Sequence, residues 1–249
     1  MMGSRSQYLF IFGFVVQFLI QPLARAGGTF DTLTPDQQRH LLSENILSLY
    51  PATNSWPRCQ IYAWIPHTPE GSAGVFVDYS NQKNYVHRIV KSEILRTFPD
   101  QKTVEISYGL GLAPVLAAFF PAPEYKVFSH IDKISNGNPG YEVRWNLSKV
   151  GFLKELKGAA RFEPVANGTL ISYWSTLEPS LLPYSFAPGY VIESMKRGCR
   201  EALESVATYI KTVHDENPAY VEQRINTLLK TVGPITEAVQ ISGPLTPEF

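Results

Sequence analysis

Apolar residues recur every three or four positions between residues 190 and 214, which predicts one long amphipathic helix. Charged residues such as Glu193, Arg197 and Lys211 fall on the other side of that helix. Burying its apolar stripe would contribute on the order of 10 to 20 kcal/mol before entropy is subtracted. The helix therefore needs an apolar surface from the rest of the chain. The stripe comprises Val191, Met195, Cys199, Ala202, Val206, Tyr209 and Val213, widened by Ile192, Leu203 and Ile210.

Upstream of this helix, apolar and polar residues alternate, as they do in strands with one buried face. The clearest case is residues 141–147, where Tyr141, Val143 and Trp145 share a face. Because consecutive strands usually pair, the last six should form an antiparallel meander, closed by the first strand. The expected fold class is α+β, with a seven-stranded sheet. The predicted strands are residues 59–65, 89–97, 103–108, 124–131, 141–147, 158–164 and 169–178, with two short helices or turns at 69–79 and 81–87.

The N-terminal part of the chain contains two further signals. An apolar run over residues 8–20, preceded by Arg5 and followed by Ala24-Arg25-Ala26, indicates a cleaved secretory signal peptide over residues 1–26. Thr34, Pro35 and Gln37 form a capping-box pattern that starts a helix, which we expect to continue through Leu49 to Pro51 and to pack outside the main body.

These signals give a domain plan and a compartment. We expect a helical extension over residues 27–56, one main domain over 57–215, and a C-terminal helix and tail over 216–249. The leader predicts a secreted or periplasmic protein. In such a compartment the two cysteines, Cys59 and Cys199, can form a disulfide or remain two buried thiols, and the sequence leaves both open.

Composition excludes several kinds of function. The formal net charge is zero and there is no basic cluster, which disfavours nucleic-acid binding. No metal-site spacing, phosphate-binding loop or hydrolase motif occurs, so we predict no metal, no cofactor and no catalytic residue. His130 and Asp132 should form a solvated pair, and His214 should sit as a cation at a helix C-terminus. Arg144 should lie on the solvent face of its strand; with the faces reversed it would be a cation inside the pocket that could anchor a carboxylate or phosphate head group.

Three long loops of the meander share one end of the sheet and are unusually apolar. They span residues 109–123, 148–156 and 179–189. Apolar surface loops generally cover something, so we interpret them as the rim and lid of a cavity. Strand aromatics should line this cavity together with the first turns of the long helix, while Cys199 onward should serve stability. The predicted pocket and lid residues are Tyr108, Leu112, Leu116, Phe119, Phe120, Tyr141, Trp145, Phe152, Tyr173, Phe186, Tyr190 and Met195.

The order of elements from residue 59 to residue 214 resembles the helix-grip fold of the START-like superfamily, which includes polyketide cyclases and coenzyme Q-binding proteins. Two local patterns are also similar: residues 75–79 (Val-Phe-Val-Asp-Tyr) before a short helix, and residues 168–173 (Gly-Thr-Leu-Ile-Ser-Tyr) before Glu178-Pro179. The resemblance implies a curved sheet that grips the long helix around a hydrophobic pocket. It carries over no catalytic residue.

Three functions remain open at this stage. The first is an exported protein that binds a hydrophobic small molecule or lipid, with residues 109–123 as its gate. The second is a cyclase or aromatase on the same fold. The third is a module whose apolar loops contact a membrane or a partner. The absence of an inward-facing nucleophile and base favours the first. The oligomeric state does not follow from the sequence.

Overall fold

The computed structural model describes residues 28–50, 56, 58–111, 123–134, 139–151, 153–165, 167–180 and 189–235, without the side chains of Tyr190 and Val191. One antiparallel sheet of eight strands runs through it in the order β1-β2-β8-β7-β6-β5-β4-β3. The strands are β1 (Ile46–Leu49), β2 (Arg58–Ile65), β3 (Ile89–Thr97), β4 (Thr103–Leu110), β5 (Glu124–Ile134), β6 (Gly140–Leu147), β7 (Leu153–Val165) and β8 (Gly168–Pro179). The α+β class and the meander from β3 to β8 agree with the sequence prediction.

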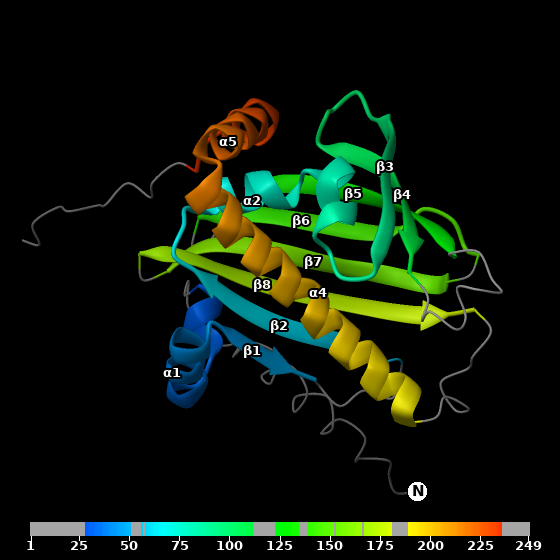
Figure 1. Ribbon diagram of the computed structural model, residues 1–249, viewed down its shortest axis with the longest axis horizontal. Helices are drawn as coiled ribbons and strands as arrows, with labels where there is room; N and C mark the ends of the chain where they lie inside the picture. The colour runs from blue at the N-terminus through cyan, green and yellow to red at the C-terminus, as the bar shows by residue number, and fades with distance from the viewer. Residues whose placement is uncertain are drawn as a thin grey trace, which may run out of the picture.

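The long helix α4 (Gly189–Glu216) lies across one face of this sheet (Figure 1). Its residues Leu203, Val206 and Ile210 are buried in one core cluster with Ile61 and Ala63 of β2. These three belong to the apolar stripe that the 3.6-residue period identifies. The apolar surface that the helix requires is therefore the inner face of the sheet.

The N-terminal helix differs from its prediction. Thr34 caps α1 (Pro35–Glu44) with the predicted capping box, but the helix ends at Asn45, whose φ of 60° is left-handed. The following residues form β1, which pairs with β2 in the register Ile46↔Ala63. The prediction of a helix up to Pro51 was wrong because a four-residue strand gains its stability from its partner. The sheet accordingly has eight strands instead of seven.

The 3-10 turn η1 (Thr29–Thr32) and α1 pack on the outer face of the sheet, opposite α4. Leu33 and Leu41 are buried there against Tyr62 of β2 and Leu170 of β8. The N-terminal helix therefore packs directly on the outer face of the sheet. The sheet thus has a covered inner face and a partly covered outer face.

Two short helices and the C-terminal helix complete the inner layer. They are α2 (Pro69–Phe76), η2 (Tyr79–Asn84) and α5 (Pro218–Val232). Tyr220 of α5 donates a hydrogen bond to Asp78 over 2.7 Å, and Arg224 lies 3.7 Å from the same carboxylate. A Cβ on Gly74 would lie 3.0 Å from the Arg224 backbone, so the close approach of α2 to α5 leaves little room for a side chain there.

The largest differences from the predicted strand boundaries occur in β7 and β5. β7 begins at Leu153 instead of residue 158, which shortens the predicted 148–156 loop. β5 extends to Ile134. The signal peptide and the tail after residue 235 lie outside the described residues, so the proposed domain limits stay predictions.

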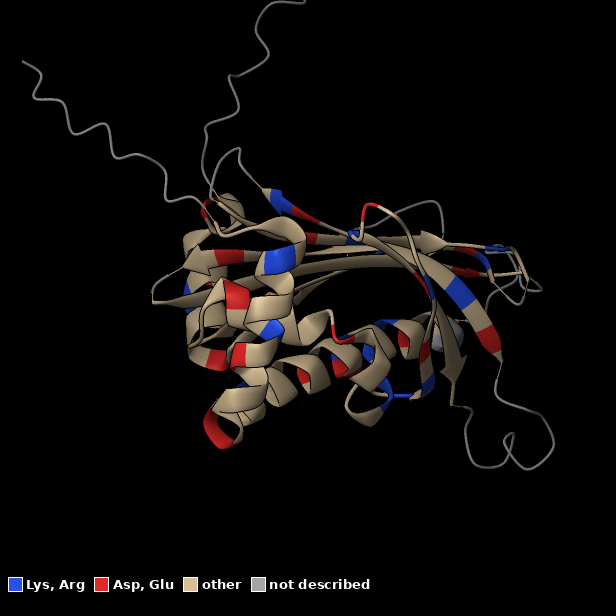
Figure 2. Cartoon of the chain, turned by 90° about the horizontal axis from the view of Figure 1, so that it is seen from above, with Lys and Arg blue, Asp and Glu red and all other residues tan. Residues whose placement is uncertain are grey.

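Figure 2 shows the sheet and the helices as two layers, with basic and acidic residues interspersed along the ribbon. This mixture agrees with the zero formal net charge. Among the helices in the described ranges, none combines the length and apolar character that a membrane span requires.

Candidate functional site

A cavity of about 510 Å³ lies between the sheet, η2 and α4. Its sheet side consists mainly of inward-facing residues of β4, β5, β6, β7 and β8, which the alternation of strand side chains places on one face, with Ile89 at the start of β3. Its helix side consists of one face of α4. Most of the lining is apolar or aromatic, and its volume falls within the range of small-molecule sites.

The structure brings four of the predicted pocket residues together. Tyr108 of β4, Trp145 of β6, Tyr173 of β8 and Met195 of α4 all line the cavity. The Trp145 and Tyr173 rings lie 5.3 Å apart, which makes a continuous aromatic wall across β6 to β8. Seven other predicted positions cannot be placed: Leu112, Leu116, Phe119, Phe120, Phe152 and Phe186 lie outside the described residues, as does the Tyr190 side chain.

Tyr141 is not a cavity residue, contrary to the prediction. It shares the inner face of β6 with Trp145 but sits four residues away, where α2 and the end of α5 cover the sheet. Its side chain is fully buried, and its hydroxyl donates to the Gly233 carbonyl over 3.2 Å. The alternation gave the correct face, but it could not show which part of that face the cavity occupies.

The helix contribution is also longer than predicted. Cavity-lining residues of α4 continue past Met195 to Cys199, Leu203 and Val206. Because α4 runs along the sheet, successive turns of the same stripe face the cavity. Leu203 and Val206 therefore serve both the core and the cavity wall.

Solved structures share this arrangement of a sheet around a long helix. A STAR-related lipid transfer protein from Xanthomonas axonopodis matches with a TM-score of 0.53 and 13% identity over 68% of this chain and 94% of its own. Human StAR-related lipid transfer protein 5 matches with a TM-score of 0.55 and 9% identity over 68% and 84% of the two chains. Human STARD10 matches with a TM-score of 0.53 and 11% identity over 78% of this chain and 85% of its own.

The chain has a START-like helix-grip fold. No protein-family model and no curated protein sequence matches it. At these identities the likeness concerns the fold alone.

Several polar side chains on the cavity wall form hydrogen bonds with protein groups. The Tyr108 hydroxyl donates to Gln82 Oε1 over 2.5 Å, and Gln82 Nε2 donates to the Phe76 carbonyl over 2.9 Å. The hydroxyls of Tyr79 and Ser129 lie 2.9 Å apart. Burial raises the pKa of Tyr79 to about 12, so this phenol keeps its proton.

Sequence reasoning missed Tyr79, Gln82 and Tyr125, all of which line the cavity. Tyr125 had a signal, because it alternates in phase with Val127 and Ser129 on β5. The sequence also indicated that Tyr79 points inward, at the end of the predicted helix 69–79, but not that it lines a cavity. Gln82 had no signal, since a short 3-10 turn has no periodicity that distinguishes an inner side.

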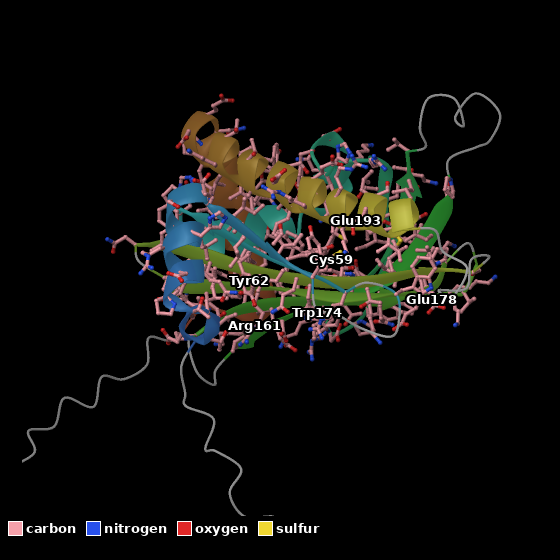
Figure 3. The ribbon with its side chains drawn as sticks, turned by 90° about the horizontal axis from the view of Figure 1, so that it is seen from below. Cys59, Tyr62, Arg161, Trp174, Glu178 and Glu193 are labelled. Atoms are coloured by element: carbon pink, nitrogen blue, oxygen red, sulfur yellow. The ribbon has the colours of Figure 1, made fainter. Side chains whose placement is uncertain are left out.

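Cys59 and Cys199 meet at the edge of the cavity. The structure holds both as free thiols, with Cys59 buried on β2 and Cys199 half-buried on α4. A hydrogen bond between the thiols lowers the pKa of Cys59 and, together with burial, raises that of Cys199. In Figure 3, Cys59 lies between the sheet and α4, whereas Tyr62, Arg161 and Trp174 lie on the other side of the sheet.

His214 differs from its predicted role as a cation at the helix end. Its imidazole stacks on that of His67, with ring centroids 4.0 Å apart and planes 7° apart. Burial, and then the charge of His67, lower the pKa of His214 to about 4. The ring is therefore neutral near neutral pH, because burial outweighs the helix dipole here.

His130 and Asp132 form the predicted pair on the outer face. His130 Nε2 lies 2.8 Å from Asp132 Oδ2, and Arg144 approaches the same oxygen at 3.0 Å. Arg144 is exposed, as predicted. No cluster of three or more metal-binding side chains occurs in the part of the chain that the structure describes.

Proposed function

We propose that this START-like protein binds a hydrophobic small molecule or lipid between the sheet and α4. The observation that carries the proposal is the 510 Å³ cavity with its mainly apolar and aromatic wall. One water occupies roughly 30 Å³ in the liquid, so this volume would hold about 17 waters. A ligand with at least about 17 non-hydrogen atoms would fit, because bonded atoms pack more closely than separate waters. Two of the proteins with a similar fold are named as lipid transfer proteins, which supports the same direction.

The cavity wall favours binding over turnover. Cys199 is its strongest nucleophile by residue type, and its thiol shares a hydrogen bond with the Cys59 thiol instead of with a general base. The hydroxyls of Tyr79, Tyr108 and Ser129 bond to neighbouring groups and not to a general base among the described residues. A cyclase-type activity would need a group beyond these.

The proposal can be tested by filling the cavity from α4. Gly198 lines the cavity, and a Cβ there would meet no atom within 4 Å. We expect Gly198→Trp to abolish uptake of the neutral dye Nile red and to remove any ligand seen by native mass spectrometry. The protein should still fold, because a non-glycine residue favours the helix.

Gly198→Ala is the matched control. It makes the same helix-favouring change with one methyl group, so it should retain dye uptake and gain about 1 kcal/mol of stability. If the wild-type protein takes up neither dye nor any co-purified apolar ligand, the proposed function is wrong. It is equally wrong if Gly198→Trp binds as well as Gly198→Ala.

We also propose transient membrane contact at the cavity mouth. Val90 and Val150 are 57% and 66% exposed. Val90 lies beside the cavity-lining Gly111, and Val150 precedes Gly151, whose carbonyl accepts a hydrogen bond from Ser180, next to the cavity-lining Pro179. Substituting both valines by Asp should reduce co-sedimentation with phosphatidylcholine–phosphatidylserine vesicles. Leu42→Asp, at an exposed position on α1, is the control and should have no effect. If wild type, the double valine variant and Leu42→Asp bind the vesicles equally, Val90 and Val150 do not form a membrane-contact surface.

Export is proposed from the leader pattern in residues 1–26 alone. Expression of the full chain in a secreting host, followed by N-terminal sequencing of the released protein, should give a first residue near Gly27. A mature chain that keeps residues 1–26 would show that they are not a cleaved signal.

A further inference from the structure

The cavity wall contains hydrogen-bond donors that no protein group uses. Tyr125 lies on the inner face of β5 and lines the cavity, yet its hydroxyl has no hydrogen-bond partner among the described residues. The Trp145 Nε1–H is likewise without one in those ranges. Both contrast with Tyr108 and Tyr79, whose hydroxyls bond to Gln82 and Ser129. Neither atom is among the fully buried polar atoms that lack a partner, so both keep accessible surface, and both residues line the cavity, where a ligand atom can accept from them.

The unused donors can only serve certain ligand groups. An indole N–H donates and never accepts. Burial alone holds the pKa of Tyr125 well above its ordinary value, so its phenol remains protonated and can donate. A ligand oxygen that accepts, such as a ketone, ester or ether oxygen, satisfies both kinds of donor.

The charges around the cavity exclude an ionised group in its interior. Among the described lining residues there is no Asp, Glu or Lys. The two basic residues, His87 and Arg88, are exposed at the rim, and His87 is already 3.1 Å from Glu201. An ionised ligand group placed against the aromatic wall would be buried without a counter-ion, which costs several kcal/mol.

We propose that the cavity selects an uncharged, largely apolar ligand with an acceptor oxygen in its buried part, and that the Tyr125 hydroxyl donates to that oxygen. This inference rests on the proposed function, because it concerns the ligand of the same cavity. Tyr125 is well placed for such selection. Its ring centroid lies 5.6 Å from that of Tyr108, and its phenol is close enough to Tyr173 to influence that residue's pKa. Tyr125 therefore lies between Tyr108, whose hydroxyl already bonds to Gln82, and the aromatic wall of Trp145 and Tyr173.

The test is displacement of Nile red by three probes of one chain length: methyl decyl ketone, dodecane and dodecanoate. We expect the ketone to bind about twofold to tenfold more tightly than dodecane, the range of one neutral hydrogen bond. Dodecanoate at about pH 8 should bind at least about tenfold more weakly than the ketone, because a carboxylate beside Tyr125, away from the basic rim residues His87 and Arg88, has no counter-ion.

Tyr125→Phe separates the hydroxyl from the ring. It should lower the affinity for the ketone about twofold to tenfold and leave the affinity for dodecane unchanged. Thermal stability should hold, since the removed hydroxyl has no protein partner. Tyr62→Phe removes a buried hydroxyl on the outer face and is the control, with wild-type affinities for all probes.

The outcomes distinguish the two proposals. If Nile red and all three probes fail to bind, the proposed function falls and this inference with it. If the dye binds but dodecanoate displaces it as well as the ketone does, only the selection of an uncharged ligand is overturned. If Tyr125→Phe changes the affinities for the ketone and for dodecane equally, or changes neither affinity, the Tyr125 hydroxyl does not donate to the ligand oxygen.

Discussion

The stacked histidines make folding stability depend on pH in a defined window. The pKa of His214 falls from 6.5 in the unfolded chain to about 4 in the fold, and burial also lowers the pKa of His67. The unfolded chain therefore binds more protons below pH 6.5. The stability that the neutral pair provides is fully present above that pH and is lost as pH falls toward about 4.

The size of the effect follows from the shift. At about 1.4 kcal/mol per pKa unit, His214 would destabilise the fold by about 2 kcal/mol between about pH 7.5 and about pH 5. Its ring is partly exposed and faces Asp215, which favours the charged form, so screening reduces this value. We expect a loss of about 1 to 2 kcal/mol.

The assay is urea unfolding of wild type and His214→Phe across this pH range. Phenylalanine keeps a flat ring beside His67 but cannot take up a proton, so the variant should lose about 1 to 2 kcal/mol less than wild type. Hydrogen bonds from Ser148 and Arg96 lower the pKa of Glu105, which adds acid sensitivity below about pH 4.5. That contribution is present in both proteins and cancels in the comparison.

Two results would refute this reasoning. Parallel pH profiles for wild type and His214→Phe would mean that His214 titrates normally in the fold. Greater stability of wild type at about pH 5 than at about pH 7.5 would mean that the pair prefers the charged form, as the helix-dipole argument predicted.

Three further changes test separate contacts. Oxidised glutathione should oxidise Cys59 and Cys199 to a disulfide and be reduced to two glutathione thiols. The bond should raise the free energy of unfolding in urea by about 4 kcal/mol, whereas Cys199→Ser should show no gain. Gly74→Ala should cost about 1 to 3 kcal/mol because its Cβ meets the Arg224 backbone, whereas Gly189→Ala, whose Cβ meets nothing within 4 Å, should not destabilise the protein. Tyr108→Phe leaves Gln82 Oε1 without its donor and should cost about 1 to 3 kcal/mol in the same urea assay; an unchanged midpoint would contradict the buried bond.

The elements with a strong local period were predictable from the sequence. The stripe of α4, the alternation of β6 and the capping box at Thr34 each depend on residues a few positions apart. β1 was not predictable, because Ile46 to Leu49 form a strand only beside β2. A helical continuation fits the same four residues.

The candidate site was predictable in its face but not in its extent. Alternation placed Trp145 and Tyr173 on the inner side of the sheet, where the cavity lies. Whether an inner residue meets the cavity or another helix depends on what packs above it, as Tyr141 shows. Gln82 lies on a 3-10 turn, and only the tertiary fold brings it under Tyr108.

The position of β2 in the sheet sets an order for assembly during synthesis. β2 is made before the meander, yet it pairs with β8, and the contact of Cys59 with Ser175 spans more than a hundred residues. The hairpins from β3 to β7 can form as they leave the ribosome, whereas β2 must wait with the apolar Ile61 and Ala63 uncovered until β8 and then α4 arrive. A nascent chain paused before residue 168 would therefore expose an apolar strand that can pair only with β1, on one of its two edges, and chaperones should bind the protein at that stage.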